Sequence, residues 1–209
     1  MSRMNYDDLA ALRPLLDSAG IEDTVLGLGQ TLGTAPHGAG GLLVVGTEAH
    51  EPWHFTAHLA DESRWNARPD LEPTLVRWNV PQNAPAHLAF GLERLEAARR
   101  SETVFVVAPT HASEGLLERV ADARRVGALV LSVHGGDAEL QQLAHESVGV
   151  PEAGLGAYLD VVQHVISQCA PGATLTRRSL RARLNSMLDA AQGLRAPGGP
   201  VAPARRQRW

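Results

Sequence analysis

The sequence feature that most constrains the fold is a strand–turn–helix–strand pattern between residues 101 and 134. Thr103 to Val107 is a run of β-branched and aromatic residues without polar alternation, which is typical of a strand buried on both faces. Pro109 has no N–H for a central ladder, so we expect this strand to end there. A helical spacing of apolar residues follows, and Ala128 to Val133 has the composition of a second buried strand. This order predicts a βαβ unit.

The same alternation of strands and helices extends on both sides of this unit. Five short strands separated by helices favour a doubly wound α/β fold, in which a mostly parallel sheet lies between two layers of helices. Gly127 suits the C-terminal cap of the central helix. We expect the other strands at 42–45, 75–80 and 148–150, and the other helices of this domain at 51–64, 87–99, 138–146 and 155–169.

The chain is predicted to consist of four segments. Residues 1–40 form helices that pack on the core or on a partner subunit, and residues 41–170 form the α/β domain. Residues 171–192 have the pattern of an amphipathic, Arg-rich helix, and residues 193–209 that of a flexible tail rich in Pro, Gly and Arg. The second of the predicted N-terminal helices depends on apolar residues at 21, 25, 28 and 32, although three glycines interrupt them.

Charge is distributed unevenly along the chain. Residues 171–209 have a net charge of +7, whereas the rest of the chain has a net charge of −11. A basic segment on an acidic body can meet an anionic partner, or it can contact its own or a neighbouring subunit. No nucleic-acid recognition motif and no interleaved aromatic residues accompany the arginines. We therefore expect a subunit contact and not a nucleic-acid or lipid partner.

Composition favours a soluble cytoplasmic protein. Hydrophobic residues make up 44% and charged residues 20% of the 209 residues, and the longest apolar runs are too short to span a bilayer. Asp7 and Asp8 stand where the apolar core of a signal peptide would begin. The single cysteine, Cys169, excludes an internal disulfide. All 19 basic residues are arginine, which we interpret as the codon bias of a GC-rich bacterial genome.

The central unit resembles the sugar isomerase (SIS) domain family over roughly residues 40–168. Residues 121–133 are similar to that family's passage of helix, Gly-Ala and strand, and Leu140 to Pro151 is similar to the segment that follows it. In this family the third strand precedes a Ser-x-Ser-Gly-x-Thr type of loop that holds a phosphate. The corresponding loop here is Ala108 to Ser113, in which Thr110 and Ser113 keep two hydroxyls while Ala108 and His111 replace a serine and the glycine.

The resemblance implies a fold, a ligand and an assembly. SIS domains are five-stranded, three-layer α/β sandwiches with a flavodoxin-like strand order, usually dimers or tetramers, and they bind phosphosugars. It therefore implies a homodimer that binds a phosphosugar or a similar anionic metabolite, without a cofactor. The departures in the loops favour a non-catalytic sensor or accessory protein. The alternatives are a phosphosugar aldose–ketose isomerase and a scaffold that acts through the Arg-rich segment.

The candidate site lies where parallel strands end, because ligands of open α/β sheets bind outside the carboxyl ends of the strands. Hydroxyls and free amides at a helix start suit an oxyanion, although Thr110 or Ser113 could equally be a helix cap. General acid–base chemistry would need a carboxylate or an imidazole. The ligand-binding candidates are Thr47, Thr110, Ser113, His134 and Asp137, and the candidates for proton transfer are Glu48, His50 and His111.

Three histidines recur at a spacing of four, at positions 50, 54 and 58. His54 and His58 can share one helix face and chelate a divalent metal ion. The segment between them, Phe-Thr-Ala, lacks the glutamate of the zinc-protease pattern. We therefore expect solvated or packing histidines, and no metal site is predicted.

Overall fold

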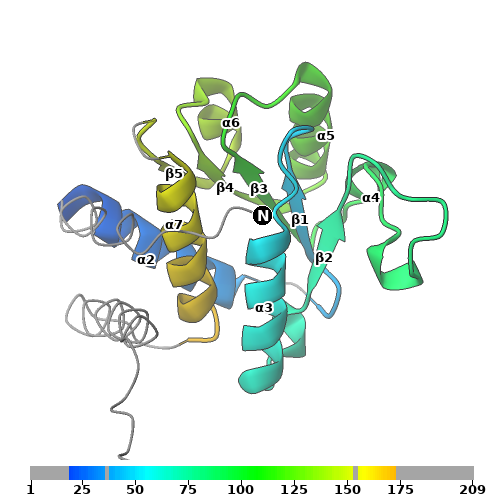
Figure 1. The fold of residues 1–209 in the computed structure, drawn as a ribbon, viewed down its shortest axis with the longest axis horizontal. Helices are drawn as coiled ribbons and strands as arrows, with labels where there is room; N and C mark the ends of the chain where they lie inside the picture. The colour runs from blue at the N-terminus through cyan, green and yellow to red at the C-terminus, as the bar shows by residue number, and fades with distance from the viewer. Residues whose placement is uncertain (1–18, 36–37, 153–154, 173–209) are drawn as a thin grey trace, which may run out of the picture.

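The computed structural model describes residues 19–35, 38–152 and 155–172. Within these residues the fold is a five-stranded parallel sheet with the strand order β2-β1-β3-β4-β5 (Figure 1). The predicted α/β class and the flavodoxin-like order are therefore confirmed. The strands are β1 (Leu42–Gly46), β2 (Pro73–Val76), β3 (Thr103–Ala108), β4 (Leu129–His134) and β5 (Glu146–Gly149).

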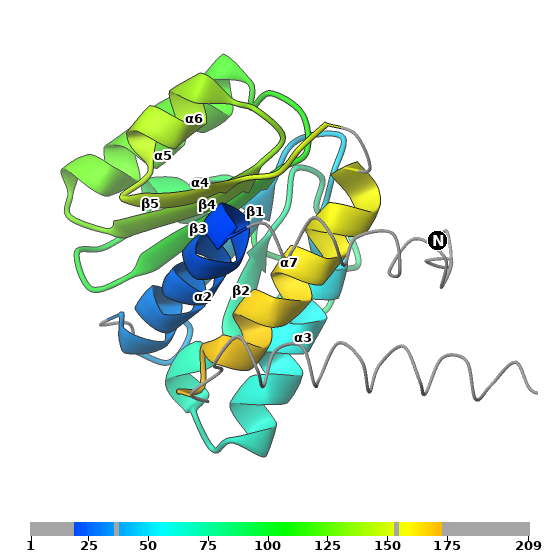
Figure 2. The same cartoon turned by 90° about the vertical axis from the view of Figure 1, so that its left-hand side faces the viewer.

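Helices cover both faces of the sheet (Figure 2). Side chains alternate along β1, so that Leu42 and Val44 join one buried core and Leu43 and Val45 join the other. The first core is covered by α2 (Ala19–Thr34), α3 (Trp53–Trp65) and α7 (Leu155–Cys169). The second is covered by the short α4 (Glu93–Glu96), α5 (Glu114–Arg125) and α6 (Ala138–Leu143). Two 3-10 turns, η1 (Pro69–Leu71) and η2 (Ala86–Leu88), complete the described elements.

The central βαβ unit forms as the sequence predicts. β3 is fully buried and ends at Ala108, directly before Pro109. Gly127 follows α5 with a φ of 97°, a left-handed conformation that favours glycine at a helix C-terminus. β3 and β4 pair over their full length, from Thr103 with Leu129 to Ala108 with His134.

The predicted helix over residues 87–99 is wrong. The chain instead forms η2, a short irregular stretch with an isolated bridge at Gly91, and the four-residue helix α4. The N–H of Arg77 donates to the carbonyl of Phe90 at 2.8 Å, and Arg77 bridges Gly91 as a strand partner. A backbone that pairs with the strand end cannot also continue a helix. The apolar spacing reflected burial of Leu95, which packs on the sheet from the short α4.

Several element boundaries also differ from the sequence prediction, among them that of β5, which occupies Glu146–Gly149 and not residues 148–150. β2 occupies Pro73–Val76 and not residues 75–80. After it the chain turns, and the indole N–H of Trp78 donates to the carbonyl of Gly46 at 2.9 Å. α6 ends at Leu143 because the chain enters β5 at Glu146, which pairs with Leu131.

Glycine permits the close contact of α2 with α7. A Cβ on Gly29 would lie 2.5 Å from Cβ of Cys169, and a Cβ on Gly33 would lie 1.9 Å from the carbonyl oxygen of Ala170. Two of the three glycines that lower the helical propensity of α2, Gly29 and Gly33, are therefore needed where the two helices touch. The predicted second N-terminal helix is confirmed, since α2 buries Val25, Leu28 and Leu32.

Several predicted segments lie outside the described residues. These are the first helix, the Arg-rich helix and the flexible tail, so the division at 1–40, 171–192 and 193–209 stays a prediction, as does the scaffold hypothesis. Among the residues that the structure does describe, no helix has both the length and the apolar character to cross a membrane.

Candidate functional site

The ends of the strands meet at one edge of the sheet. The register pairs Gly46 of β1 with Val107 of β3, and His134 of β4 with both Ala108 and Gly149. The loops beyond them converge on the start of α7. A Cβ on Gly135 would lie 2.3 Å from the carbonyl oxygen of Pro109 and 3.0 Å from Cδ1 of Leu155. The predicted site residues therefore follow strands whose carboxyl ends share one edge.

Asp137 is a structural clamp at this edge. Its carboxylate accepts the N–H of Glu139 at 3.1 Å and of Leu140 at 3.0 Å, which caps α6. The other carboxylate oxygen accepts the N–H of Ala112 at 2.7 Å. This carboxylate thus ties the loop after β3 to the start of α6, and three backbone donors already occupy it.

His134 is buried beside this clamp. Its Nδ1 accepts the backbone N–H of Asp137 at 3.0 Å, so the neutral ring carries its hydrogen on Nε2. Burial lowers the pKa of His134, and the nearby carboxylate of Asp137 opposes this only in part. Nε2 is enclosed and has no hydrogen-bond partner among the described residues. A buried donor without a partner costs free energy, which a hydrogen bond to a ligand or a water would offset.

Further enclosed polar atoms without partners lie near the same edge. Oγ1 of Thr47 and Nε2 of His50 follow β1, and the hydroxyl of Tyr158 lies in the first turn of α7. Burial lowers the pKa of His50, against an opposing effect of Asp160, and raises the pKa of Tyr158. At neutral pH these groups are uncharged, so they can donate to or accept from a neutral or anionic ligand.

The other predicted residues are exposed at the same edge. Glu48, Thr110, His111 and Ser113 all have exposed side chains. Ser113 is the N-cap residue of α5, but its side chain makes no capping hydrogen bond. The capping hypothesis is therefore wrong for the Ser113 hydroxyl, which is free to meet a ligand.

Sequence reasoning missed Tyr158 and a charged cluster after β1 and β2. Arg77 donates from Nε and Nη2 to the two carboxylate oxygens of Glu51, at 3.0 and 3.1 Å. The guanidinium also lies 4.8 Å from the ring centroid of Trp53. No local spacing could have found a pair that is 26 positions apart. Because Glu51 balances its charge, Arg77 is not a free cation for a phosphate.

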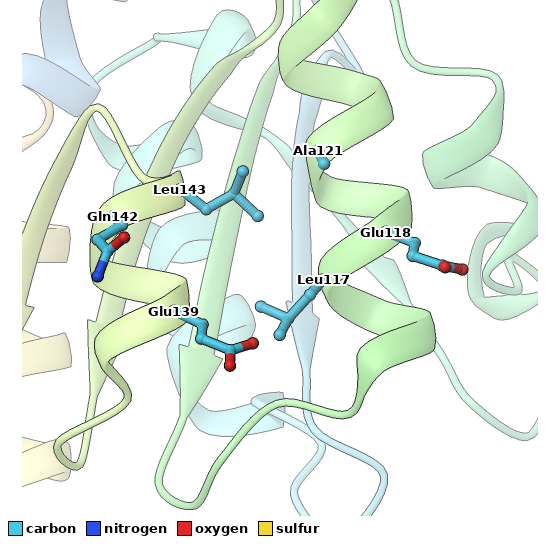
Figure 3. Close-up of a pocket in the computed structure, with 6 residues that line it drawn as sticks. All are labelled: Leu117, Glu118, Ala121, Glu139, Gln142 and Leu143. Carbon is cyan, nitrogen blue, oxygen red and sulfur yellow. The ribbon is translucent and has the colours of Figure 1, made fainter.

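Two cavities of about 400 Å³ lie elsewhere on the described part of the chain. One is a groove between α5 and α6, where the side chains of Leu117 and Leu143 point into the space between the helices and Glu139 lies beside Leu117 (Figure 3). The other lies beside the C-terminal ends of α2 and α7 and is lined by Arg68 and Cys169. Neither is lined by the unpartnered atoms at the strand ends. Those atoms are enclosed, whereas Thr110 and Ser113 are exposed.

His54 and His58 lie on α3, where it packs against α7. Their rings contact each other and not the residues after the strands. Within residues 19–35, 38–152 and 155–172, no three His, Cys, Asp or Glu side chains are arranged as they stand to hold a metal ion.

Comparisons with solved structures define the class of this fold. No model of a protein family matches the chain, and no curated protein has a matching sequence. A proposed sugar-binding protein from Salmonella typhimurium LT2 is 19% identical with a TM-score of 0.59, over 90% of this chain and 55% of that protein. The sugar isomerase domain of an RpiR transcription factor from Sphaerobacter thermophilus is 13% identical with a TM-score of 0.54, over 90% and 94% of the two chains. The Vibrio vulnificus NanR protein, in complex with ManNAc-6P, is 8% identical with a TM-score of 0.52, over 90% of this chain and 67% of that protein.

The strand order and the two helix layers define a doubly wound α/β domain with its candidate site at the carboxyl edge of the sheet. Among such domains, the chain has the fold of the sugar isomerase domain. It spans about half the length of the Salmonella protein.

Proposed function

We propose that this protein binds a phosphorylated sugar, or a similar anionic metabolite, at the carboxyl edge of its sheet and acts as a non-catalytic sensor or accessory protein. The observation that carries the proposal is the group of buried polar atoms without partners at that edge. Oγ1 of Thr47, Nε2 of His134 and the hydroxyl of Tyr158 come from three separate elements. Uncharged donors of this kind suit the hydroxyl groups of a sugar.

The phosphate would lie at the start of α5. This helix has 12 residues, and its first N–H groups favour an anion. The exposed hydroxyls of Thr110 and Ser113 stand directly before it. The likeness to the NanR structure with ManNAc-6P and to a domain of a transcription factor supports the ligand class and a sensing role.

A non-catalytic role fits the state of the proposed proton carriers. General acid–base catalysis needs a side chain that is held within hydrogen-bond reach of the substrate. Glu48 and His111 are exposed, so solvent and not a packed environment surrounds much of each side chain. His50 differs, because it is half-buried and burial lowers its pKa, so that it is a free base at neutral pH. This favours a phosphosugar isomerase with His50 as its base as the second candidate.

The test is calorimetric titration of the full chain with a panel of sugar phosphates, each paired with the free sugar. We expect saturable binding of at least one sugar phosphate and none of its free sugar. Ser113→Ala should weaken that binding about tenfold or more, because a hydrogen bond to a charged group contributes about 1.5–3 kcal/mol. The matched control is Ser101→Ala, an exposed serine that precedes β3 at the opposite edge of the sheet.

Three results would contradict the proposal or distinguish a non-catalytic protein from an isomerase. No binding across the panel contradicts phosphosugar recognition, and an unchanged affinity of Ser113→Ala contradicts the phosphate position. Conversion of a bound aldose phosphate to its ketose, followed by NMR, would overturn the non-catalytic form and favour the isomerase. In that case His50→Gln should abolish the conversion.

A further inference from the structure

Histidine side chains gather where α3 packs against α7. On α3, His54 and His58 are one helical turn apart, and on α7 Asp160 and His164 are likewise one turn apart. The two pairs face each other across the helix contact, and 106 positions separate His58 from His164. This cluster lies outside the proposed sugar site and has no part in the proposed function.

One nitrogen is the centre of this cluster. Nε2 of His58 lies 2.8 Å from Nε2 of His54 and 3.2 Å from Nδ1 of His164. The neighbouring ring centroids are 4.5 and 4.4 Å apart. On the far side of His54, Nδ1 lies 3.6 Å from Oδ1 of Asp160. Nε2 of His58 therefore contacts one nitrogen of each of the other two rings, and the carboxylate of Asp160 lies behind His54.

Hydrogen bonding alone does not account for both contacts of His58 Nε2. A neutral imidazole nitrogen has either one hydrogen or one lone pair, directed along a single line in the ring plane. Nε2 of His58 can therefore make one good hydrogen bond, although two nitrogens lie within reach of it. A cation that accepts a lone pair from each ring would satisfy all three nitrogens at once.

The spacing of the nitrogens suits such a cation. Zinc binds imidazole nitrogen at about 2.0–2.1 Å, so two nitrogens on one ion lie roughly 2.9–3.3 Å apart. The 3.2 Å contact of His58 lies within this range and the 2.8 Å contact lies just below it. Side-chain rotations that also bring the nitrogens of His54 and His164 together would let one ion bind all three rings. The side chain of His54 is 53% exposed, which leaves a path for an ion.

We propose that His54, His58 and His164 bind a divalent transition-metal ion of the zinc, nickel or copper class, which links α3 to α7. His54 and His58 contribute Nε2 and His164 contributes Nδ1. Asp160, whose Oδ1 lies 3.6 Å from Nδ1 of His54, is a positioning residue that orients this ring, as carboxylates do for many metal-bound histidines. Imidazole ligands favour these three metals over magnesium or calcium.

The test is titration of the untagged full chain with ZnCl₂ after dialysis against a chelator, followed by calorimetry. We expect one ion per chain. His58→Ala and His164→Gln should each weaken the affinity at least about tenfold, because even residues behind the ligands change metal affinity 10- to 100-fold. Asp160→Asn should weaken it within that range and keep the stoichiometry. His87→Ala, an exposed histidine outside the cluster, is the matched control and should leave binding unchanged.

The variants separate the three-histidine site from simpler explanations. If His164→Gln binds zinc as tightly as the wild type, the α3 pair alone chelates the ion and the proposal is wrong. If no variant differs from the wild type, or no zinc binds, it is also wrong. Circular dichroism of each variant checks the fold. A Co²⁺ absorption spectrum of tetrahedral intensity in the wild type, lost in His58→Ala, would support the proposal independently of affinity.

Discussion

Replacement of Asp137 by alanine should destabilise the protein more than loss of an ordinary helix cap. The carboxylate accepts three backbone N–H groups, from Ala112, Glu139 and Leu140, and it is buried. A hydrogen bond to a charged group contributes about 1.5–3 kcal/mol, but water can reach some of the released donors. We therefore expect Asp137→Ala to lower the free energy of unfolding by about 3 kcal/mol, compared with about 1 kcal/mol for a typical N-cap.

Asparagine divides this effect into two parts. Asp137→Asn keeps one oxygen, which can still accept from the start of α6, but its NH₂ group cannot accept the N–H of Ala112. We expect a loss of about 1–2 kcal/mol, since one charged hydrogen bond is removed. Asp122→Ala is the control, because Asp122 is exposed on α5 and pairs only with the neighbouring Arg125, so its change should stay below about 0.5 kcal/mol.

Urea denaturation followed by circular dichroism gives these free energies, provided that the slope with denaturant is the same for all four proteins. The reasoning is refuted if Asp137→Ala lies within about 0.5 kcal/mol of the wild type, the range of ordinary surface substitutions. It is also refuted if the asparagine and alanine variants are equally unstable, because the contact with Ala112 would then account for the whole effect.

Two further changes test the carboxyl edge. Because burial lowers the folded-state pKa of His134 below 6.5, the unfolded chain takes up the proton first. The free energy of unfolding should therefore fall as pH drops below 6.5. His134→Asn, which keeps an acceptor for the N–H of Asp137, should lose less of this free energy between pH 7 and pH 5, as measured by urea denaturation. An equal dependence on pH in the wild type and the variant would contradict the assigned neutral ring. Gly46→Ala should cost at least about 2 kcal/mol, because its Cβ would lie 1.8 Å from the carbonyl oxygen of His50. Its control is Gly156→Ala, where a Cβ meets nothing within 4 Å and helix propensity predicts a gain in stability of up to about 1 kcal/mol. Equal melting temperatures of the two variants would argue against the described backbone.

Continuous apolar runs, together with apolar residues at a period of 3.6, carried most of the fold prediction. The strands β1, β3 and β4 are almost entirely buried, and α5 and α7 each place one stripe of apolar side chains in a core, so local sequence reports these elements directly. The segment over residues 87–99 failed because its conformation depends on pairing of Phe90 with Arg77, which no local spacing reveals.

The sequence predicted the position of the candidate site better than it predicted the roles of the individual residues. Topology alone places His134 and Thr47 at the strand ends. Whether a polar side chain there is free or already bonded depends on partners far along the chain. Asp137 was expected to bind a ligand, yet Ala112, 25 positions away, occupies part of its carboxylate. Tyr158 gave no signal, because a tyrosine in an apolar helix is usually a core residue.

The glycine contact of α2 with α7 has a mechanical consequence for both sites. α7 has 15 residues, so it is a rod of about 22 Å. Near one end its backbone rests on Gly29 and Gly33, and at the other end it presents Tyr158 to the strand edge and Asp160 to the histidines. A bulkier side chain at Gly33 would push the C-terminal end of α7 away from α2 and so tilt the whole helix. The position of the Tyr158 side chain therefore depends in part on Gly29 and Gly33, two residues of α2 without side chains that contact the opposite end of α7.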